Sequence, residues 1–268
     1  MKIGCDQAIM SDYYLFRGAL KDLLSPKKIA AALILIILPA LLSLLWRTSA
    51  RSEFQAEVVY NTLAAGLVFG FILVILAVVF GTGVVTEEIE QKTIVYLLTR
   101  PVPRWRILLV KFLAAFLVIT VTVALAAVAL AFVTFGPDRL SESRLGRDLL
   151  VLPVGALGYG ALFLLMATVL NRPLLYGLLF AFGWESWVPN MPGNFQKVSL
   201  MSYLRVLAPH PQPEAESVEI SRLLTVLNPA AISESTAKWV LFGVIIVALA
   251  AALLLFSVNE YVPRDDTE

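Results

Sequence analysis

The sequence predicts an all-α membrane protein whose helices cross the bilayer several times, and two features lead to this prediction. Of the 268 residues, 59% are hydrophobic and only 15% are charged, whereas about a quarter of the residues in a soluble domain carry charge. Six stretches of the chain are apolar over lengths near the roughly 20 residues that a helix needs to cross a hydrocarbon core of ~30 Å. The expected fold class is therefore a polytopic bundle with six transmembrane helices.

The six apolar stretches give the expected spans directly. The fifth is the weakest because it is short and contains Gly177 and Gly183, so a tilted or broken span is an alternative there. No repeat with a period of roughly 20 to 50 residues is visible, and we expect residues 1–268 to form a single transmembrane domain. The spans are expected near residues 29–46, 58–85, 105–135, 149–170, 174–188 and 239–258.

Lys and Arg residues in the short flanking segments predict the orientation of the bundle. They are more frequent before the first span, between the second and third, and between the fourth and fifth than on the opposite side. We therefore expect a multi-pass protein of the cytoplasmic (inner) membrane with both termini in the cytoplasm. The residues on the expected cytoplasmic side are Arg17, Lys21, Lys27, Lys28, Lys92, Arg100, Arg104, Arg106 and Arg172.

The segment before the first span, residues 1–28, has the pattern of an interfacial helix. Its apolar residues Tyr13, Phe16, Leu20, Leu23 and Leu24 lie near helical spacing, and Pro26 is expected to end the helix. A soluble helix packed on a cytoplasmic loop is the alternative. The residues expected at the membrane surface are Arg17, Lys21, Lys27 and Lys28 here, and Trp105 and Arg106 at the start of the third span.

The segment between the second and third spans, residues 86–104, is expected to lie in the cytoplasm and to contain a short amphipathic helix. Thr86 is a candidate N-cap, because the first turn would then hold acidic residues at the positive end of the helix dipole. Pro101 and Pro103 are expected to end the regular structure. The acidic residues are Glu87, Glu88 and Glu90, and the apolar stripe is Ile94, Leu97 and Leu98.

The acidic residues of this segment indicate a surface that binds another protein. A solvated loop would satisfy the positive-inside rule with Lys and Arg alone, and that rule is nearly indifferent to Glu. The carboxylates would pair with basic residues of a partner, or with Arg100 and Arg104 of the same segment. The sequence leaves both alternatives open.

The same segment resembles the ABC type-2 exporter permeases, which show an acidic turn, Gly-Thr, paired leucines, Pro-Val, an arginine and a lysine that opens the next span. Lys92 stands where that family commonly has glycine. The rest of the chain resembles the family more loosely, through the interfacial helix, the six spans and a long external segment before the last span. The matching residues here are Glu88, Glu90, Thr93, Leu97, Leu98, Pro101, Val102, Arg104 and Lys111.

The resemblance implies how such a chain would work. In that family a coupling helix between spans two and three sits in a groove of a separate ATPase subunit, and two permease chains enclose the pathway. The implied partners are an ABC ATPase, a second permease chain in a homodimer or heterodimer, and the lipid bilayer. ATP and Mg would bind to the ATPase and no cofactor to this chain. The implied coupling residues are Glu87, Glu88, Glu90, Thr93, Ile94, Leu97, Leu98, Pro101 and Arg104.

The sequence itself offers no material for nucleotide chemistry. It contains no G-x-x-x-x-G-K-[ST] phosphate loop. With a net charge of +1, one cysteine and one histidine, it gives no reason to expect a nucleic-acid partner or a His-based metal site. Glu185, between Trp184 and Trp187, is expected at the outer interface. We therefore expect a protein that is not itself an enzyme.

The segment 189–238 is expected outside the membrane, with two short amphipathic helices joined by a Pro-rich tether. One stripe consists of Leu200, Leu204 and Leu207, and the other lies near residues 223–227. The segment would either close the exit of a pathway or simply pack on the outer ends of the helices. Within the second span, the glycines of "GLVFG" could line a pathway or a dimer seam, or serve ordinary helix packing.

The expected function is that of the permease subunit of an ATP-driven exporter, and the scarcity of buried charge favours an amphipathic or hydrophobic cargo. One alternative is a permease-like mechanotransmitter that acts on an external partner without moving a solute. A membrane-embedded lipid hydrolase or transferase is disfavoured, because the sequence shows no pairing of a nucleophile with a base.

Overall fold

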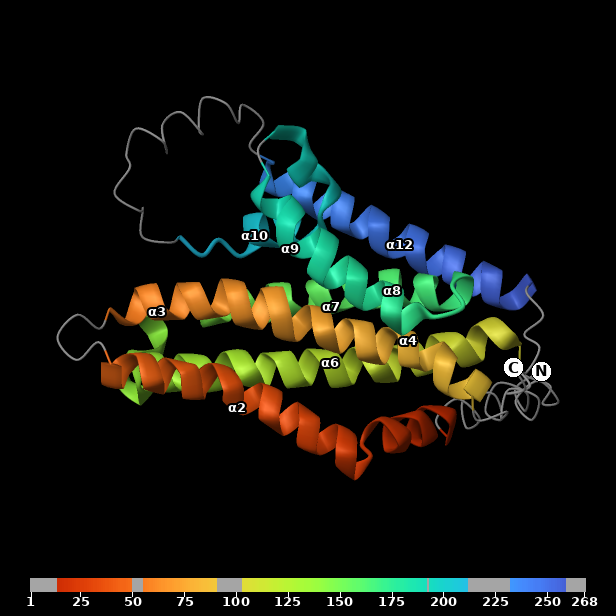
Figure 1. Cartoon of the computed structure of the whole chain (residues 1–268), viewed down its shortest axis with the longest axis horizontal. Coiled ribbons are helices and arrows are strands. Elements are labelled where there is room, and N and C mark those ends of the chain that lie inside the picture. Colours follow the sequence, from red (N-terminus) through yellow and green to blue (C-terminus); the bar gives the residue numbers. More distant parts are fainter. Residues whose placement is uncertain (1–13, 50–54, 91–102, 192, 212–231, 259–268) are drawn as a thin grey trace, which may run out of the picture.

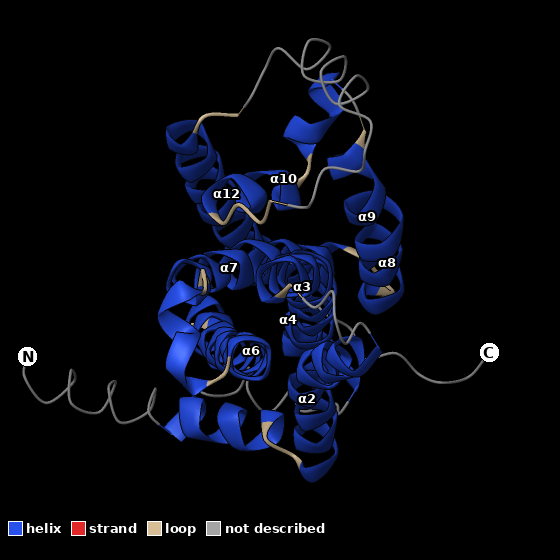
Figure 2. Ribbon diagram, turned by 90° about the vertical axis from the view of Figure 1, so that its left-hand side faces the viewer, coloured by secondary structure: helices blue, strands red, loops and turns tan. Residues whose placement is uncertain are grey.

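A computed structural model describes residues 14–49, 55–90, 103–191, 193–211 and 232–258. These residues form helices and short connections, and none of them lies in a β-strand (Figure 2). Five helices within these ranges are long and apolar enough to cross a membrane. The prediction of an all-helical, multi-pass membrane protein is confirmed.

The five long helices correspond to five of the six expected spans, and their bounds differ from the expected ones by only a few residues. The second is one continuous helix built from three consecutive segments, of which the middle one is π-helical. The helices are α2 (Pro26–Ser49), α3 (Ala56–Leu63) with η1 (Ala64–Leu73) and α4 (Val74–Glu90), α6 (Arg104–Phe135), α7 (Leu145–Val169) and α12 (Glu234–Val258).

The remaining expected span, residues 174–188, is helical but broken into short pieces. Gly183 lies in its π-helical turn, and Gly177 packs so closely on α4 that a Cβ there would lie 3.0 Å from Val78. The count of six spans is therefore not confirmed, since no uninterrupted long helix forms here. The pieces are α8 (Pro173–Leu179), η3 (Phe180–Trp184), α9 (Glu185–Trp187) and η4 (Val188–Asn190).

The prediction that Thr86 caps a new helix is wrong. α4 runs through this position without a break as far as Glu90, and the Thr86 hydroxyl donates a hydrogen bond to the carbonyl of Thr82 at 2.9 Å. Thr86 therefore bonds to the preceding turn of its own helix, which a threonine inside a helix commonly does. Residues 91–102 of the cytoplasmic segment lie outside the described residues.

The bundle has a central group of helices and a peripheral group (Figure 2). α4, α6 and α7 pack against one another, while α2 lies against α6, α12 against α7 and α8 against α4. The outer faces of α2 and α12 are apolar and open, with Ile34 66% and Val247 67% exposed. In a membrane protein such faces contact lipid or another protein chain.

The two ends of the bundle have different contents (Figure 1). At one end lie the helix of residues 14–23, the start of α2, the start of α6 and the ends of α4 and α12. At the other end begin α3, α7 and α12, beside the short helix α10 (Leu200–Leu207). α6 ends there at Phe135, the next residue Gly136 has a φ of 79° that suits glycine, and η2 (Pro137–Glu142) leads to α7.

The central helices are packed closely at two glycines. A Cβ at Gly81 of α4 would lie 3.2 Å from the carbonyl oxygen of Gly160 and 3.2 Å from the Cβ of Phe163, both on α7. Gly160 in turn packs on α6, since a Cβ there would lie 3.2 Å from the ring of Phe112. Because α7 is held between α4 and α6, it cannot move away from a side chain at position 81.

We expect Gly81→Ala to lower the free energy of unfolding by about 1–3 kcal/mol, the usual cost of overpacking. Thermal unfolding of the purified protein in detergent micelles measures this. Gly243→Ala on α12 is the matched control, because a Cβ added at Gly243 would find only open space within 4 Å. Equal thermal stability of the two variants would contradict the close packing of α4 on α7.

Candidate functional site

Several buried polar contacts converge on the chain from residue 199 to residue 211, which we call the α10 segment. Ser199 caps the start of α10, and its hydroxyl oxygen accepts a hydrogen bond from the N–H of Ser202 at 3.4 Å. Leu200, Leu204 and Leu207 are all buried, and Leu204 is only 1% exposed. α10 packs on α7 and α12. The segment is thus an integral part of the bundle.

The beginning of the α10 segment is held by Glu185, the first residue of α9. Its Oε1 accepts hydrogen bonds from the Tyr159 hydroxyl of α7, from the Ser199 hydroxyl at 2.9 Å and from the N–H of Met201. Glu185 is only 5% exposed, so this carboxylate is buried and does not face the aqueous interface as a surface residue would. We call these four residues the Glu185 cluster.

The end of the α10 segment is held by Asp148 in the first turn of α7. Its Oδ2 accepts a hydrogen bond from the Tyr60 hydroxyl at 2.6 Å, and His210 Nε2 lies 3.2 Å from the same oxygen. The rings of Tyr60 and Phe69 lie beside the His210 ring. The positive end of the α7 dipole favours a carboxylate at this position. Asp148, Tyr60 and His210 form the Asp148 cluster.

Side chains also bond to the backbone carbonyls at the end of the α10 segment. Arg147 Nε donates to the carbonyl of Leu207, and Arg144 donates to that of Pro209 at 3.0 Å. Asn61 of α3 donates to the carbonyl of Pro211 at 3.2 Å. These bonds satisfy carbonyls that no regular helix or sheet would satisfy, so the non-helical end of the segment can lie against the bundle.

Each of the two carboxylates uses only one of its oxygens. Asp148 Oδ1 and Glu185 Oε2 are buried, and neither has a hydrogen-bond partner within the part of the chain that the structure describes. A buried polar atom of this kind is costly, and in a membrane protein it marks a candidate functional position.

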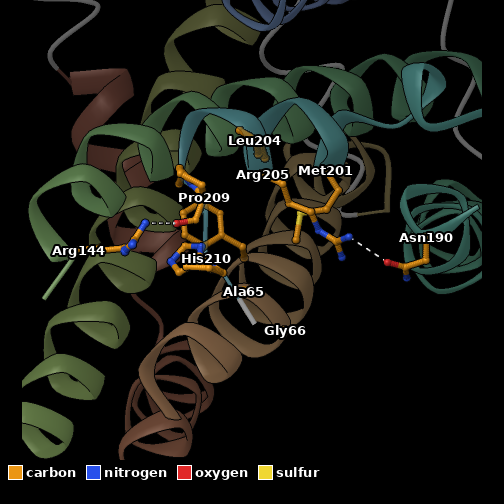
Figure 3. A pocket seen from close by; sticks show the side chains of 12 residues that line it. Ala65, Gly66, Arg144, Asn190, Met201, Leu204, Arg205, Pro209 and His210 are labelled. Atoms are coloured by element: carbon orange, nitrogen blue, oxygen red, sulfur yellow. Dashed lines mark hydrogen bonds between the residues drawn. The ribbon is translucent and has the colours of Figure 1, made fainter. Parts of the chain in front are cut away.

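A cavity of about 590 Å³ lies against the α10 segment (Figure 3). Its wall on one side is the π-helical segment η1, through Ala65, Gly66 and Phe69, and on the other side the α10 segment, through Leu204 and His210. Cavities of this size bind small ligands in many proteins. Gly66 of the "GLVFG" motif therefore lines a cavity.

The polar part of the cavity wall carries two guanidinium groups. Figure 3 shows that of Arg144 beside His210 and that of Arg205 beside Asn190. Arg205 donates a hydrogen bond to Asn190 Oδ1 at 2.9 Å, and Arg144 lies 3.8 Å from Glu57. Partial desolvation lowers the pKa of the Arg205 guanidinium, and the nearby Tyr159 and Glu185 act in the opposite direction. The wall is therefore amphipathic, since the two cations lie beside the apolar side chains of Phe69, Met201 and Leu204.

The residues predicted to couple to an ATPase are only partly within the described structure. Glu87, Glu88 and Glu90 are in the last turn of α4, and Arg104 is the first residue of α6. The structure describes the backbone of these four residues but not their side chains. The predicted coupling residues Thr93, Ile94, Leu97, Leu98 and Pro101 also lie outside them.

The predicted interfacial residues gather at the end of the bundle away from α10 (Figure 1). Arg17 and Lys21 lie on the helix of residues 14–23 and are exposed. Lys27 and Lys28 lie in the first turn of α2, and Trp105, 47% exposed, and Arg106 lie in the first turn of α6. The structure thus brings them to the same end as the described end of α4.

The residues of the two clusters were not predicted to act together. Glu185 was predicted only as a residue of the outer interface, and no role was predicted for Asp148. The local signals available were an acid within an apolar run at Glu185 and an acid at the start of one at Asp148. Their partners are distant in the chain, because Tyr60 lies 88 residues from Asp148 and His210 lies 62 residues from it. Such pairs are visible only once the helices are packed.

We expect Glu185→Ala to loosen the α10 segment, because the Tyr159 hydroxyl and the Met201 N–H would each lose a buried hydrogen-bond acceptor. Each donor left without a partner costs about 1–3 kcal/mol. Hydrogen exchange of the α10 amides measures this, and exchange should become at least about tenfold faster. Glu185→Gln is the matched control, since its carbonyl oxygen still accepts. Unchanged protection in Glu185→Ala would show that Glu185 does not hold α10.

Comparison with known proteins identifies the family of this membrane bundle. A search of curated proteins found no match. A family model described as "ABC-2 family transporter protein" matches residues 48–260, which include four of the five long helices, the two clusters and the cavity. The chain therefore belongs to the ABC-2 family of transporter proteins.

Proposed function

We propose that this chain is the membrane-spanning permease subunit of an ATP-driven exporter, and that a separate ATPase subunit supplies the nucleotide chemistry. The observation that carries the proposal is the family match over residues 48–260 of a multi-pass helical bundle. Membership of an ABC transporter family implies an ATPase partner, and the sequence has no phosphate loop of its own.

The path of the second span supports a mechanical role for the coupling segment. α4 reaches Glu90, which lies within the predicted coupling segment 86–104, and continues in the other direction into η1. η1 forms a wall of the cavity through Ala65 and Phe69. A movement of an ATPase docked at the far end of α4 would therefore tilt one continuous helix and change the cavity at its other end.

The π-helical segments are the places where such a movement would be absorbed. π-helical turns are rare and occur often at functional sites. η1 and η3 lie close together, since the rings of Phe71 and Phe182 are 5.9 Å apart. We infer that these two segments adjust when the transporter changes between inward-open and outward-open states.

The cargo that fits this arrangement is amphipathic. The cavity combines the apolar side chains of Phe69, Met201 and Leu204 with the polar groups of Arg144 and Arg205. The open apolar faces of α2 and α12 leave room for a second permease chain beside the first. The test is to reconstitute the complex in vesicles and add amphipathic compounds. If the compounds stimulate the partner's ATPase and accumulate across the vesicle membrane, the result supports export. If they stimulate the ATPase without accumulating, the result supports the mechanotransmitter.

We expect Leu97→Asp to abolish copurification with the ATPase, because a carboxylate would be desolvated in an apolar docking groove. Leu97→Met is the matched control, since it conserves volume and should copurify normally. Membrane fractionation checks that both variants insert. If Leu97→Asp still copurifies with the ATPase at wild-type yield, the docking face is wrong.

The single natural cysteine provides a test of orientation. Cys5 is predicted in the cytoplasm, so a membrane-impermeant maleimide should label it only after the cells are permeabilised. In a Cys5→Ser background, Ser235→Cys at the exposed start of α12 should be labelled in intact cells. The reverse labelling pattern would invert the proposed topology.

A further inference from the structure

A groove with a charged rim and an apolar floor lies between the first halves of α7 and α12, and neither the family nor the proposed function accounts for it. Its volume is about 500 Å³. It is separate from the cavity of Figure 3 and shares none of the residues that line that cavity. The two helices begin at the same end of the bundle (Figure 1), so their charged first turns lie together.

The rim of the groove carries a surplus of positive charge. Glu234 Oε1 lies 3.8 Å from Arg147 and 3.0 Å from Lys238. These two cations and one carboxylate leave one positive charge unbalanced within the rim. All three side chains are about half exposed, and exposed ion pairs contribute only about 0–1 kcal/mol. A phosphate can therefore join the cations at little cost.

The floor of the groove is apolar and follows both helices away from the rim. On α7 the floor is formed by Val154 and Leu157, and on α12 by Phe242 and Ile245. The groove narrows where the helices approach, since a Cβ at Gly158 would lie 4.0 Å from Ile245. The floor has no polar side chain that would orient a polar solute.

The length of the groove corresponds to one leaflet of a bilayer. Arg147 and Leu157 are ten residues apart on α7, which is about 15 Å of helix. Half of a hydrocarbon core of ~30 Å is the same length. Trp239, 74% exposed beside the rim, is a residue type enriched at the membrane surface. The rim therefore lies at headgroup depth and the floor at the depth of the acyl chains.

We propose that this groove binds one anionic phospholipid of the adjoining leaflet. Its phosphodiester lies between Arg147 and Lys238, and one acyl chain lies along Val154 and Leu157. The single negative charge of the phosphodiester neutralises the single surplus charge of the rim. A phosphate between two cationic side chains forms charge-assisted hydrogen bonds, which are stronger than those between neutral groups.

The bound lipid stabilises the α10 segment. Leu207 at the end of α10 forms part of the groove wall, and its carbonyl accepts the hydrogen bond from Arg147 Nε. A phosphate on Arg147 fixes the guanidinium that holds this carbonyl. Lipid in the groove therefore reduces the mobility of the segment that borders the cavity.

Native mass spectrometry of the full-length protein, titrated with phosphatidylglycerol, tests the proposal. Lys238→Gln should weaken binding of one phosphatidylglycerol by at least about tenfold, and Val154→Trp should prevent it by filling the floor. The matched controls are Lys197→Gln, an exposed lysine outside the groove, and Val169→Trp at the other end of α7; both should bind as the wild type does.

Two further probes separate the contributions of the headgroup and the acyl chain. Diacylglycerol lacks the phosphate and glycerol phosphate lacks the chains, and each should bind far more weakly than phosphatidylglycerol. Wild-type affinity of Lys238→Gln for phosphatidylglycerol would overturn the proposal, as would equally tight binding of diacylglycerol. A change from monomer to dimer mass on lipid removal, lost in Val154→Trp, would assign the groove to a second copy and would also overturn it.

Discussion

The cost of a buried polar group that has no hydrogen-bond partner is the constraint on which the arrangement of the α10 segment depends. This segment leaves helical geometry after Leu207, and backbone outside a helix can lie against the bundle only where its polar groups find partners. The side chains that donate to its carbonyls are those of Arg147, Arg144 and Asn61. Glu185 and Asp148 hold the two ends of the segment, and each carboxylate also binds a tyrosine of a long helix. The segment is therefore fixed to the bundle by polar contacts that water would weaken.

This constraint explains how a chain with few buried charges can hold an amphipathic cavity. The side chains that bond the carbonyls of Leu207 and Pro209 are those of Arg147 and Arg144. Arg144 also borders the cavity, so one guanidinium serves both the structure and the surface offered to a ligand. In our proposal, the continuous α3–η1–α4 helix relates this surface to the ATPase at the opposite end of the bundle.

The sequence predicted the parts of the fold that depend on local hydrophobicity. Five spans lie within a few residues of their expected bounds, because the length of an apolar run is set by the thickness of the bilayer. The sequence did not predict that α4 would continue through Thr86, because the choice between a cap and a continued helix depends on where the helix leaves the membrane. Nor did it predict η1, since no local pattern distinguishes a π-helical segment from an α-helical one.

The candidate site was harder to predict than the fold. Its polar residues come from several separate helices and connections, and each alone has an ordinary role: a tyrosine in a span, an acid at a helix start, a histidine between prolines. Only packing brings Tyr60, Asp148 and His210 together. The coupling residues were predicted from a contiguous motif, and that prediction rests on the resemblance and on no contact in the described structure.

The most direct test of this account is a double-mutant cycle between Asp148 and His210, the pair that joins α7 to the end of the α10 segment. The free energy of unfolding in micelles is measured for Asp148→Ala, His210→Ala and the double variant. Asp148→Ala removes the Tyr60 hydrogen bond in the single and in the double variant alike, so that loss cancels in the cycle. The account predicts non-additivity of about 1 kcal/mol or more, as for residues in direct contact. Effects that add to within about 0.3–0.5 kcal/mol would show that the two residues act independently, and would contradict the account.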